Sequence, residues 1–341
     1  MGLQLDQLVK LATAAVKATP SASFSWEGTS YTRDELNETL RQELKALAPD
    51  YRTYKINQNT IFALLEQTID EVFPEKIIQL YGSFADIKTF KQGDKPIFTQ
   101  KITTASRRRA KQFIGKVGLA GRYEVFKLDG QSYEVATNAI GGAAQIQFEE
   151  FLDGRVDFAD VLDIVLEGMD ECIYIEIEAQ LEGAAANMSV GSNKKSNNTF
   201  VEGDMDALLS VADTYGKATI YCTFEFAAKM WPSDARMSDA MKDQRWTGNG
   251  YVATYKNHSV VVLPQSYNDE TNSHKVVNPG LAYIVPTGSE KPIKIAIEGG
   301  AIVDEYVNAD RSREVQMYKK IGVRAIFSPG ICVYEDTSLT R

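Results

Sequence analysis

A strongly basic segment inside an acidic chain restricts how this protein can fold. Residues 88–127 contain eleven Lys and Arg but only Asp94 and Glu124, which gives the segment a charge of +9. The whole chain carries −9, so the remaining residues carry −18. The middle of the segment has several glycines and few large apolar residues, so it cannot form a core of its own. The sequence therefore predicts a part of the chain that projects from the body.

Alternating apolar and polar residues on both sides of this region predict strands. The alternation covers residues 95–102 before the arginine-rich part and residues 123–128 after it. An Asp-Gly pair at 129–130 is a strong hairpin signal, and a further alternating run follows over 131–135. We therefore expect a long extended hairpin or loop.

The run of three arginines at 107–109 has three interpretations. A solvated charged loop is the ordinary one. Binding of nucleic acid would require aromatic residues for stacking, and only Phe113 and Tyr123 lie nearby. The third is an intersubunit strap, in which a cationic hairpin lies across the acidic surface of a neighbouring copy. We expect the strap. Its candidate contact residues are Arg107, Arg108, Arg109, Lys111, Lys116 and Arg122.

The first eighty residues are expected to be helical. Apolar residues recur there every three or four positions in three stripes, and a proline follows each stripe. Thr32 and Glu35 form a capping-box pattern before the second stripe. The narrow apolar faces and polar backs are typical of helices that dock on something larger, such as a partner subunit. The stripes cover 5–16, 36–47 and 61–72, and the prolines are Pro20, Pro49 and Pro74.

The segment from Asp157 to about Leu181 can be interpreted in two ways. Large apolar residues recur in it every three or four positions, which favours one helix of roughly 37 Å. Ile173, Ile175 and Ile177, however, alternate with polar residues as in a strand. The length and the acidic residues favour the helix. Its apolar stripe consists of Leu162, Leu166, Met169, Ile173, Ile177 and Leu181.

The remainder of the chain predicts mixed structure and then strands. The composition of 183–198 indicates a mobile loop. In the last strands, alternate apolar residues from Val315 to Phe327 share one face, with Lys319 as the exception. Helices are expected near 205–212 and 233–245, a hairpin over 251–263, and strands over 218–226, 291–297, 301–307, 315–327 and 331–334.

The usual signatures of catalysis and of cofactor binding are absent from the sequence. His258 and His274 lie in a predicted turn and a polar loop, where solvated surface residues are expected. Nucleophile-elbow, phosphate-loop, dinucleotide, zinc-protease and calcium-loop motifs do not occur. The cysteines are expected to be buried, reduced thiols; they are Cys172, Cys222 and Cys332. We therefore expect no enzymatic activity, no cofactor and no metal.

Localisation signals are also absent. No apolar run has the length needed to span a bilayer, and no basic leader precedes an apolar core at the N-terminus. An intracellular origin and no membrane partner are expected.

The order of these elements resembles that of the major capsid proteins of tailed bacteriophages, the Hong Kong 97 type. The resemblance is firmest from Gln147 to the end. Residues 148–153 and the helix after them resemble the return of the family's extended loop into its spine helix. Segments that resemble its axial and peripheral domains are 251–264, 282–286, 291–294, 298–300, 320–323 and 330–335.

This resemblance implies an α+β fold of the Hong Kong 97-like capsid type. Such a fold has an N-terminal helical arm, a long extended hairpin loop, a spine helix, a peripheral domain and an axial domain. The expected divisions are 1–82 for the N-terminal helical arm, 83–150 for the extended loop hairpin, 151–187 for the spine helix of the peripheral domain, 188–290 for the axial domain and 291–341 for the remainder of the peripheral domain.

The resemblance also implies a structural role in a virion. Copies of the chain would form homo-hexamers and homo-pentamers of an icosahedral shell, assembled in the host cytoplasm, with portal and scaffolding proteins as partners. Packaged double-stranded DNA would be contacted non-specifically. Two other functions stay open: an encapsulin-like bacterial nanocompartment shell, and a nucleic-acid-binding protein that uses the basic loop 88–127.

Overall fold

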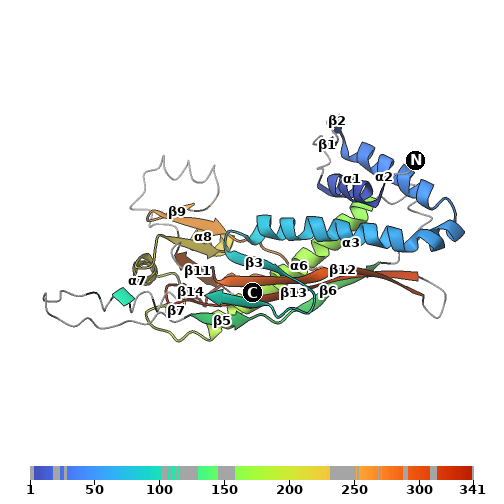
Figure 1. The fold of residues 1–341 in the computed structure, drawn as a ribbon. Helices are drawn as coiled ribbons and strands as arrows, with labels where there is room; N and C mark the ends of the chain where they lie inside the picture. Colours follow the sequence, from blue (N-terminus) through green and yellow to red (C-terminus); the bar gives the residue numbers. More distant parts are fainter. Residues whose placement is uncertain are drawn as a thin grey trace, which may run out of the picture.

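The computed structural model shows an elongated molecule with two larger β-sheets and a layer of N-terminal helices over one of them (Figure 1). Separate helices and mainly antiparallel strands confirm the α+β class. The residues that the structure describes are 4–17, 24–26, 29–100, 106, 110–111, 114, 130–144, 158–230, 251, 253–267, 269, 271–286, 291–307 and 313–339.

The N-terminal region contains three helices, as predicted. They are α1 (Leu5–Lys17), α2 (Arg33–Leu47) and α3 (Tyr51–Tyr81), and the short strands β1 (Phe24–Trp26) and β2 (Thr29–Tyr31) pair between the first two. The predicted capping box is confirmed: the Thr32 hydroxyl accepts from the Glu35 N–H, and the Glu35 carboxylate accepts from the Thr32 N–H at 2.8 Å.

The predicted end of a helix at Pro74 is wrong, because α3 continues to Tyr81. A proline inside a helix costs about 3 kcal/mol through its missing N–H and its ring. Beyond it, Ile77 and Tyr81 are buried in the core. Burying a side chain such as that of Ile77 contributes about 1.5–3 kcal/mol, which offsets the cost of the proline.

The larger body on which these helices dock is their own chain. Leu8 and Leu11 of α1 and Leu40 of α2 are fully buried in one hydrophobic cluster with the sheet and the later helix. Two polar contacts add to the packing: the Lys17 ammonium lies 2.6 Å from the Glu75 carboxylate, and the Thr13 hydroxyl donates to Glu71. The apolar faces are thus covered within one subunit.

A four-stranded sheet lies beneath the helices (Figure 1), in the order β3 (Ala85–Phe90), β12 (Ile293–Val307), β13 (Arg313–Ala325) and β6 (Asn138–Ala144). β3 is parallel to β12, and the other pairs are antiparallel. The two predicted strands 291–297 and 301–307 are one strand, β12, with a register shift between Glu298 and Ile302. Gly299, at φ +68°, supplies the left-handed conformation there.

The segment with two interpretations is a helix, α6 (Phe158–Ala186). All six residues of the predicted apolar stripe, from Leu162 to Leu181, are buried. α6 packs against β13 and β6 with this stripe and contacts α1 with its edge. The segment forms a helix because its 3.6-residue apolar period continues for nearly the whole length, whereas the strand-like alternation covers only Ile173 to Ile177.

The second large sheet has six strands and its own hydrophobic cluster with α7 (Glu202–Asp213) and α8 (Phe224–Lys229). The predicted strand 218–226 ends at Cys222, because the Thr223 hydroxyl caps α8. Lys256 and Asn257, both with positive φ, make the predicted hairpin turn. The order is β7 (Lys194–Asn197), β14 (Cys332–Asp336), β11 (Leu281–Pro286), β8 (Ala218–Cys222), β10 (His258–Val262) and β9 (Thr254–Tyr255).

One part of this sheet differs from the expectation. The predicted loop 183–198 contains the last turn of α6 and all of β7, which pairs in parallel with β14. β14 belongs to the segment 291–341, but it lies in the six-stranded sheet between β7 and β11. The predicted helix near 233–245 lies outside the described residues.

Candidate subunit-contact surface

The candidate contact residues belong to a segment of which the structure places only a part. Lys111 is described and exposed. Lys88, Lys91 and Lys95, at the beginning of the basic segment, are exposed as well. The other candidates lie outside the described residues: Arg107, Arg108, Arg109, Lys116 and Arg122.

The base of the extended segment is a short antiparallel ladder. β4 (Ile97–Gln100) pairs with β5 (Gln131–Glu134), and the register joins Ile97 to Glu134 and Gln100 to Gln131. The predicted strand 95–102 therefore pairs with the run 131–135 where the segment leaves the body, and the predicted strand 123–128 lies outside the described residues. Asp129 of the predicted turn lies outside the described residues.

This base is fastened to the four-stranded sheet by apolar packing. Phe98 of β4 and Val135, just after β5, are buried together with Ala296 of β12. The ring of Phe98 lies edge-on to that of Phe90, with centroids 5.8 Å apart, and the Lys88 ammonium lies 4.7 Å from the centre of the Phe98 ring.

Glu298, a buried carboxylate that sequence reasoning missed, adds a polar anchor to the same base. It accepts hydrogen bonds from the Thr137 hydroxyl and from the Gly93 N–H at 3.1 Å. The two bonds lower the pKa of Glu298, because they favour its ionised form. One signal was present in the sequence: a single glutamate interrupts the apolar run of β12 directly before two glycines.

Helix α3 supplies hydrogen-bond acceptors to the part of the β12 edge that β3 does not cover. β3 pairs with β12 only as far as Glu298, and no other described strand pairs with this side of β12 beyond that point. Asp70 and Glu66 of α3 accept from the N–H groups of Ala301 and Val303, at 2.7 and 3.0 Å. These carboxylates take the place of strand carbonyls and protect the edge.

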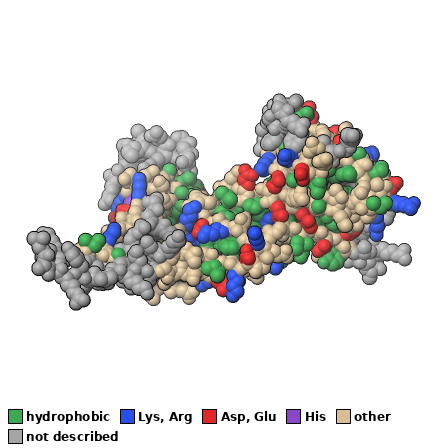
Figure 2. Space-filling view, viewed as in Figure 1, with side chains coloured by type: hydrophobic (Ala, Val, Ile, Leu, Met, Phe, Trp, Pro, Cys, Tyr) green, Lys and Arg blue, Asp and Glu red, His purple; other side chains and the backbone are tan. Residues whose placement is uncertain are grey.

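Helix α6 is strongly acidic. It carries eight Asp and Glu and no Lys, Arg or His among its 29 residues. Figure 2 shows acidic side chains, interspersed with Lys and Arg, over the middle of one face of the molecule, where α3 lies in front of α6 in Figure 1. Asp163 lies 2.5 Å from Arg33 of α2, whereas Glu167 is exposed and Glu176 half-buried.

Burial raises the pKa of three carboxyl groups on this helix, Asp163, Asp170 and Glu176. For Asp163 the nearby Arg33 opposes the effect of burial, and for Asp170 the Tyr81 hydroxyl does so. The ionised forms are thus less well stabilised than they would be in water. The charge of α6 is opposite in sign to that of the basic segment.

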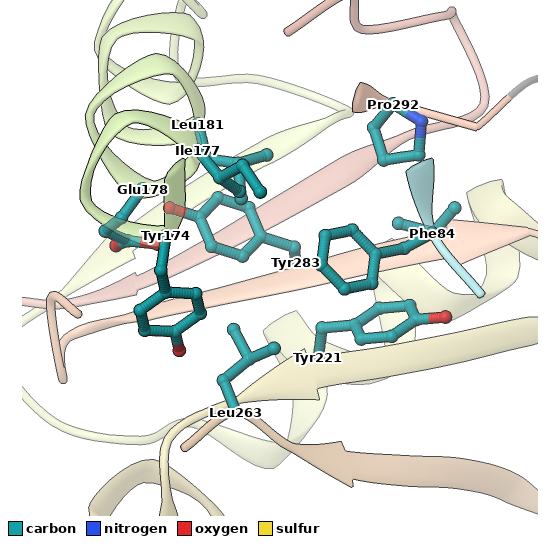
Figure 3. Close-up of a pocket in the computed structure, with 10 residues that line it drawn as sticks. Phe84, Tyr174, Ile177, Glu178, Leu181, Tyr221, Leu263, Tyr283 and Pro292 are labelled. Atoms are coloured by element: carbon teal, nitrogen blue, oxygen red, sulfur yellow. The ribbon is translucent and has the colours of Figure 1, made fainter. Parts of the chain in front are cut away.

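The junction between the two sheets is aromatic and tightly filled. Figure 3 shows the rings of Phe84, Tyr174, Tyr221 and Tyr283 gathered around one small hollow. Its free volume of about 20 Å³ has room for about one water molecule, so it is too small for a ligand.

Helix α6 is also hydrogen-bonded to the loop that precedes β11. The Tyr174 hydroxyl donates to the Pro264 carbonyl at 2.5 Å, and burial raises the pKa of Tyr174. Glu178 accepts from the Asn278 N–H, and Glu182 accepts from the Asn278 side-chain amide. These bonds attach α6 to the segment that leads into the six-stranded sheet.

Groups with catalytic or metal-binding potential are scattered. His258 is half-buried and not a solvated surface residue. Its Nε2 lies 3.5 Å from the Asp213 carboxylate. His274 is exposed, as expected. Within the described ranges, no group of three or more His, Cys, Asp or Glu is placed to hold a metal ion. No helix among those residues is long and apolar enough to cross a membrane.

Two of the three cysteines are buried as expected, and the third is not. Cys222 and Cys332 are buried, and burial raises the pKa of Cys222 to about 12 and that of Cys332 to about 11. Cys172 is exposed, because it lies outside the buried stripe of α6.

Comparisons with known proteins give one family and a set of similar structures. The sequence profile described as "SPbeta prophage-derived putative capsid protein YonB" matches residues 7–333. No curated protein matches the chain.

Three of the similar structures are particles or capsids. A virus-like particle from Pyrococcus furiosus is 11% identical, with 81% of this chain and 99% of that chain covered and a TM-score of 0.44. The mature capsid of bacteriophage PhiM1 is 8% identical, with 76% and 87% covered and a TM-score of 0.47. The head of Helicobacter pylori bacteriophage KHP40 is 14% identical, with 75% and 90% covered and a TM-score of 0.46.

Proposed function

This chain belongs to the YonB family of prophage-derived capsid proteins, and we propose that it is a major capsid protein, the repeating subunit of an icosahedral phage shell. The observation that carries the proposal is the family match over residues 7–333, which includes the helical layer and nearly all of both sheets. The chain is accordingly a structural component of a virion and acts without catalysis.

In this proposal, copies of the chain form homo-hexamers and homo-pentamers, and the shell encloses double-stranded DNA through non-specific contacts. One surface then has to serve rings of two sizes, which requires contacts that tolerate a change of angle.

Portal and scaffolding proteins and assembly in the host cytoplasm also belong to the proposal. They follow from the role of a phage shell subunit, whose assembly has to begin and end at defined places.

We further propose that the basic segment is an intersubunit strap. Its candidate contacts are Arg107, Arg108, Arg109, Lys111, Lys116 and Arg122. Three observations support this role: the exposed Lys111, the fastened base of β4 and β5, and the acidic helix α6, whose sign is opposite.

The proposed function is tested by the size of the purified particle. The full chain is expected to sediment as rings or shells far larger than the 37.8 kDa subunit and to show closed particles in electron micrographs. A chain that stays monomeric at high concentration, in both low and high salt, would contradict the proposal.

The content of the particles separates the phage shell from the two other functions. DNA inside particles from infected or induced cells agrees with a phage shell, whereas a cargo protein in place of DNA indicates an encapsulin-like compartment. Tight, salt-dependent retardation of DNA by the isolated monomer would indicate a nucleic-acid-binding protein.

A further inference from the structure

One edge of the four-stranded sheet is a long, uncharged strand. β6 pairs with β13 without a register shift from Asn138 to Ala144. Its sequence, NAIGGAA, contains no charged residue and no proline. Among the described residues no strand pairs with its other side, and in Figure 1 it forms the outer border of the sheet. The outward N–H and C=O groups of such an edge can pair with another chain.

The other edges of the two large sheets carry the usual protection against such pairing. β3, at the opposite edge of the same sheet, has Asp86 and Lys88. In the six-stranded sheet, the edge strand β7 has Lys194 and Lys195, and the edge strand β9 has only two residues. Charges and short length are the common means by which edges avoid other chains. β6 has neither.

The packing of the subunit requires glycine at only one of the two adjacent glycines of β6. A Cβ at Gly141 would lie 2.0 Å from the Met317 carbonyl oxygen, so the packing of the subunit itself excludes a side chain. A Cβ at Gly142 would meet no atom within 4 Å. Glycine inside a strand costs about 0.5–1 kcal/mol relative to alanine, and nothing inside the subunit requires it at 142. Such a glycine often marks the close approach of another backbone.

We propose that β6 pairs, antiparallel, with β6 of a second copy around a two-fold axis, so that one sheet runs through both subunits. The inference rests on the proposed function, because an icosahedral shell contains two-fold axes and therefore needs a surface that contacts itself. In antiparallel self-pairing, every residue of the strand lies beside residues of the same short strand in the other copy, so like charges on the strand would lie close together. An uncharged edge of small residues fits a second copy of itself without such a conflict.

The test places charges on the free edge without disturbing the subunit. Ala139 and Gly142 are both exposed, and at Gly142 a side chain has open space. The variants A139D/G142D and A139K/G142K are each expected to stay folded and to lose the particles formed by the wild-type chain. An equal mixture of the two is expected to recover assembly, because opposite charges then face each other across the axis.

Matched controls separate the edge from a general effect of charge. A139S, which adds no charge and keeps Gly142, is expected to assemble. T89D, an exposed change on the opposite edge strand β3, is expected to assemble as well. Circular dichroism and thermal melting of each variant show that the subunit is folded.

Two results would overturn the β6 contact while the proposed function stands: particles of wild-type size from both charged variants, or no recovery in their mixture. The second result would point to a different segment on this edge. If the wild-type chain itself forms no particle, the proposed function fails. The β6 contact is then judged by whether the mixture, and neither variant alone, sediments as a dimer.

Discussion

Lys319 is a buried lysine on an apolar strand face, and a distant carboxylate makes its burial possible. Lys319 is only 2% exposed and lies in β13 between the buried residues Met317 and Ile321. Its ammonium lies 2.5 Å from the Asp70 carboxylate, which also accepts from the Ala301 N–H. The sequence marks Lys319 as the exception of its face. Its partner is on a helix 249 residues away, where no local pattern indicates it.

Removal of Lys319 is expected to destabilise the subunit. Lys319→Ala leaves Asp70 without its cation and opens space in the core, so we expect the free energy of unfolding to fall by about 2–3 kcal/mol. Asp70 is about one-third exposed, and water therefore limits the loss. Urea denaturation of dissociated subunits measures it.

Lys320→Ala is the matched control, since the Lys320 side chain is 44% exposed and lies 4.0 Å from Glu298. Its expected effect is below about 0.5 kcal/mol. Equal losses for the two variants would contradict the importance of the buried pair.

At the scale of elements, the contact between α3 and α6 contains a carboxylate whose burial is costly. The Tyr81 hydroxyl donates to Asp170 at 2.8 Å, and Lys76 contributes a favourable charge nearby. Burial nevertheless raises the pKa of Asp170, so the folded state holds the proton more readily than the unfolded chain does.

This shift predicts a pH dependence of definite sign. Because the folded pKa is raised, the stability that Asp170 contributes is fully present below the unfolded pKa of about 4 and is lost as the pH rises through the folded pKa. Asp170→Asn removes that loss and keeps an acceptor for Tyr81. The stability of the variant relative to wild type is therefore expected to increase between pH 3.5 and pH 7, as measured by denaturant unfolding.

Glu167→Gln, which removes an exposed carboxylate from the same helix, is the control for the loss of one charge. A difference between Asp170→Asn and wild type that stays constant or decreases with pH would show that burial does not govern Asp170.

At the scale of the whole molecule, the unequal distribution of charge is the property most directly tied to assembly. The basic segment carries +9, and the rest of the chain carries −18. Opposite charges on different copies attract over about 10 Å at moderate salt, which suits a contact that forms and rearranges during assembly.

Charge reversal tests the strap. Arg107→Glu, Arg108→Glu and Arg109→Glu together are expected to abolish particles while the subunit stays folded, as observed by sedimentation and circular dichroism. The control reverses three exposed lysines outside the segment, Lys10, Lys45 and Lys55, to Glu, with the same change in net charge. Particles of normal size from the arginine variant, or loss of particles from both, would contradict a specific strap.

The sequence by itself determined the elements whose signal is local. The capping box before α2, the apolar stripe of α6 and the strands at the base of the extended segment each depend on neighbours a few residues apart. Backbone geometry turns such spacing into structure directly. The order of these elements then sufficed for the resemblance to a capsid protein.

Only the tertiary structure decided how distant elements share charges and edges. It buries the N-terminal helices on their own subunit, pairs Lys319 with Asp70, anchors the loop base on Glu298 and places β14 between β7 and β11. Within the described part of the chain, it also leaves one edge of β6 unpaired. These features depend on residues that are far apart in the chain, and their free energy arises when the elements meet, so no local period encodes them.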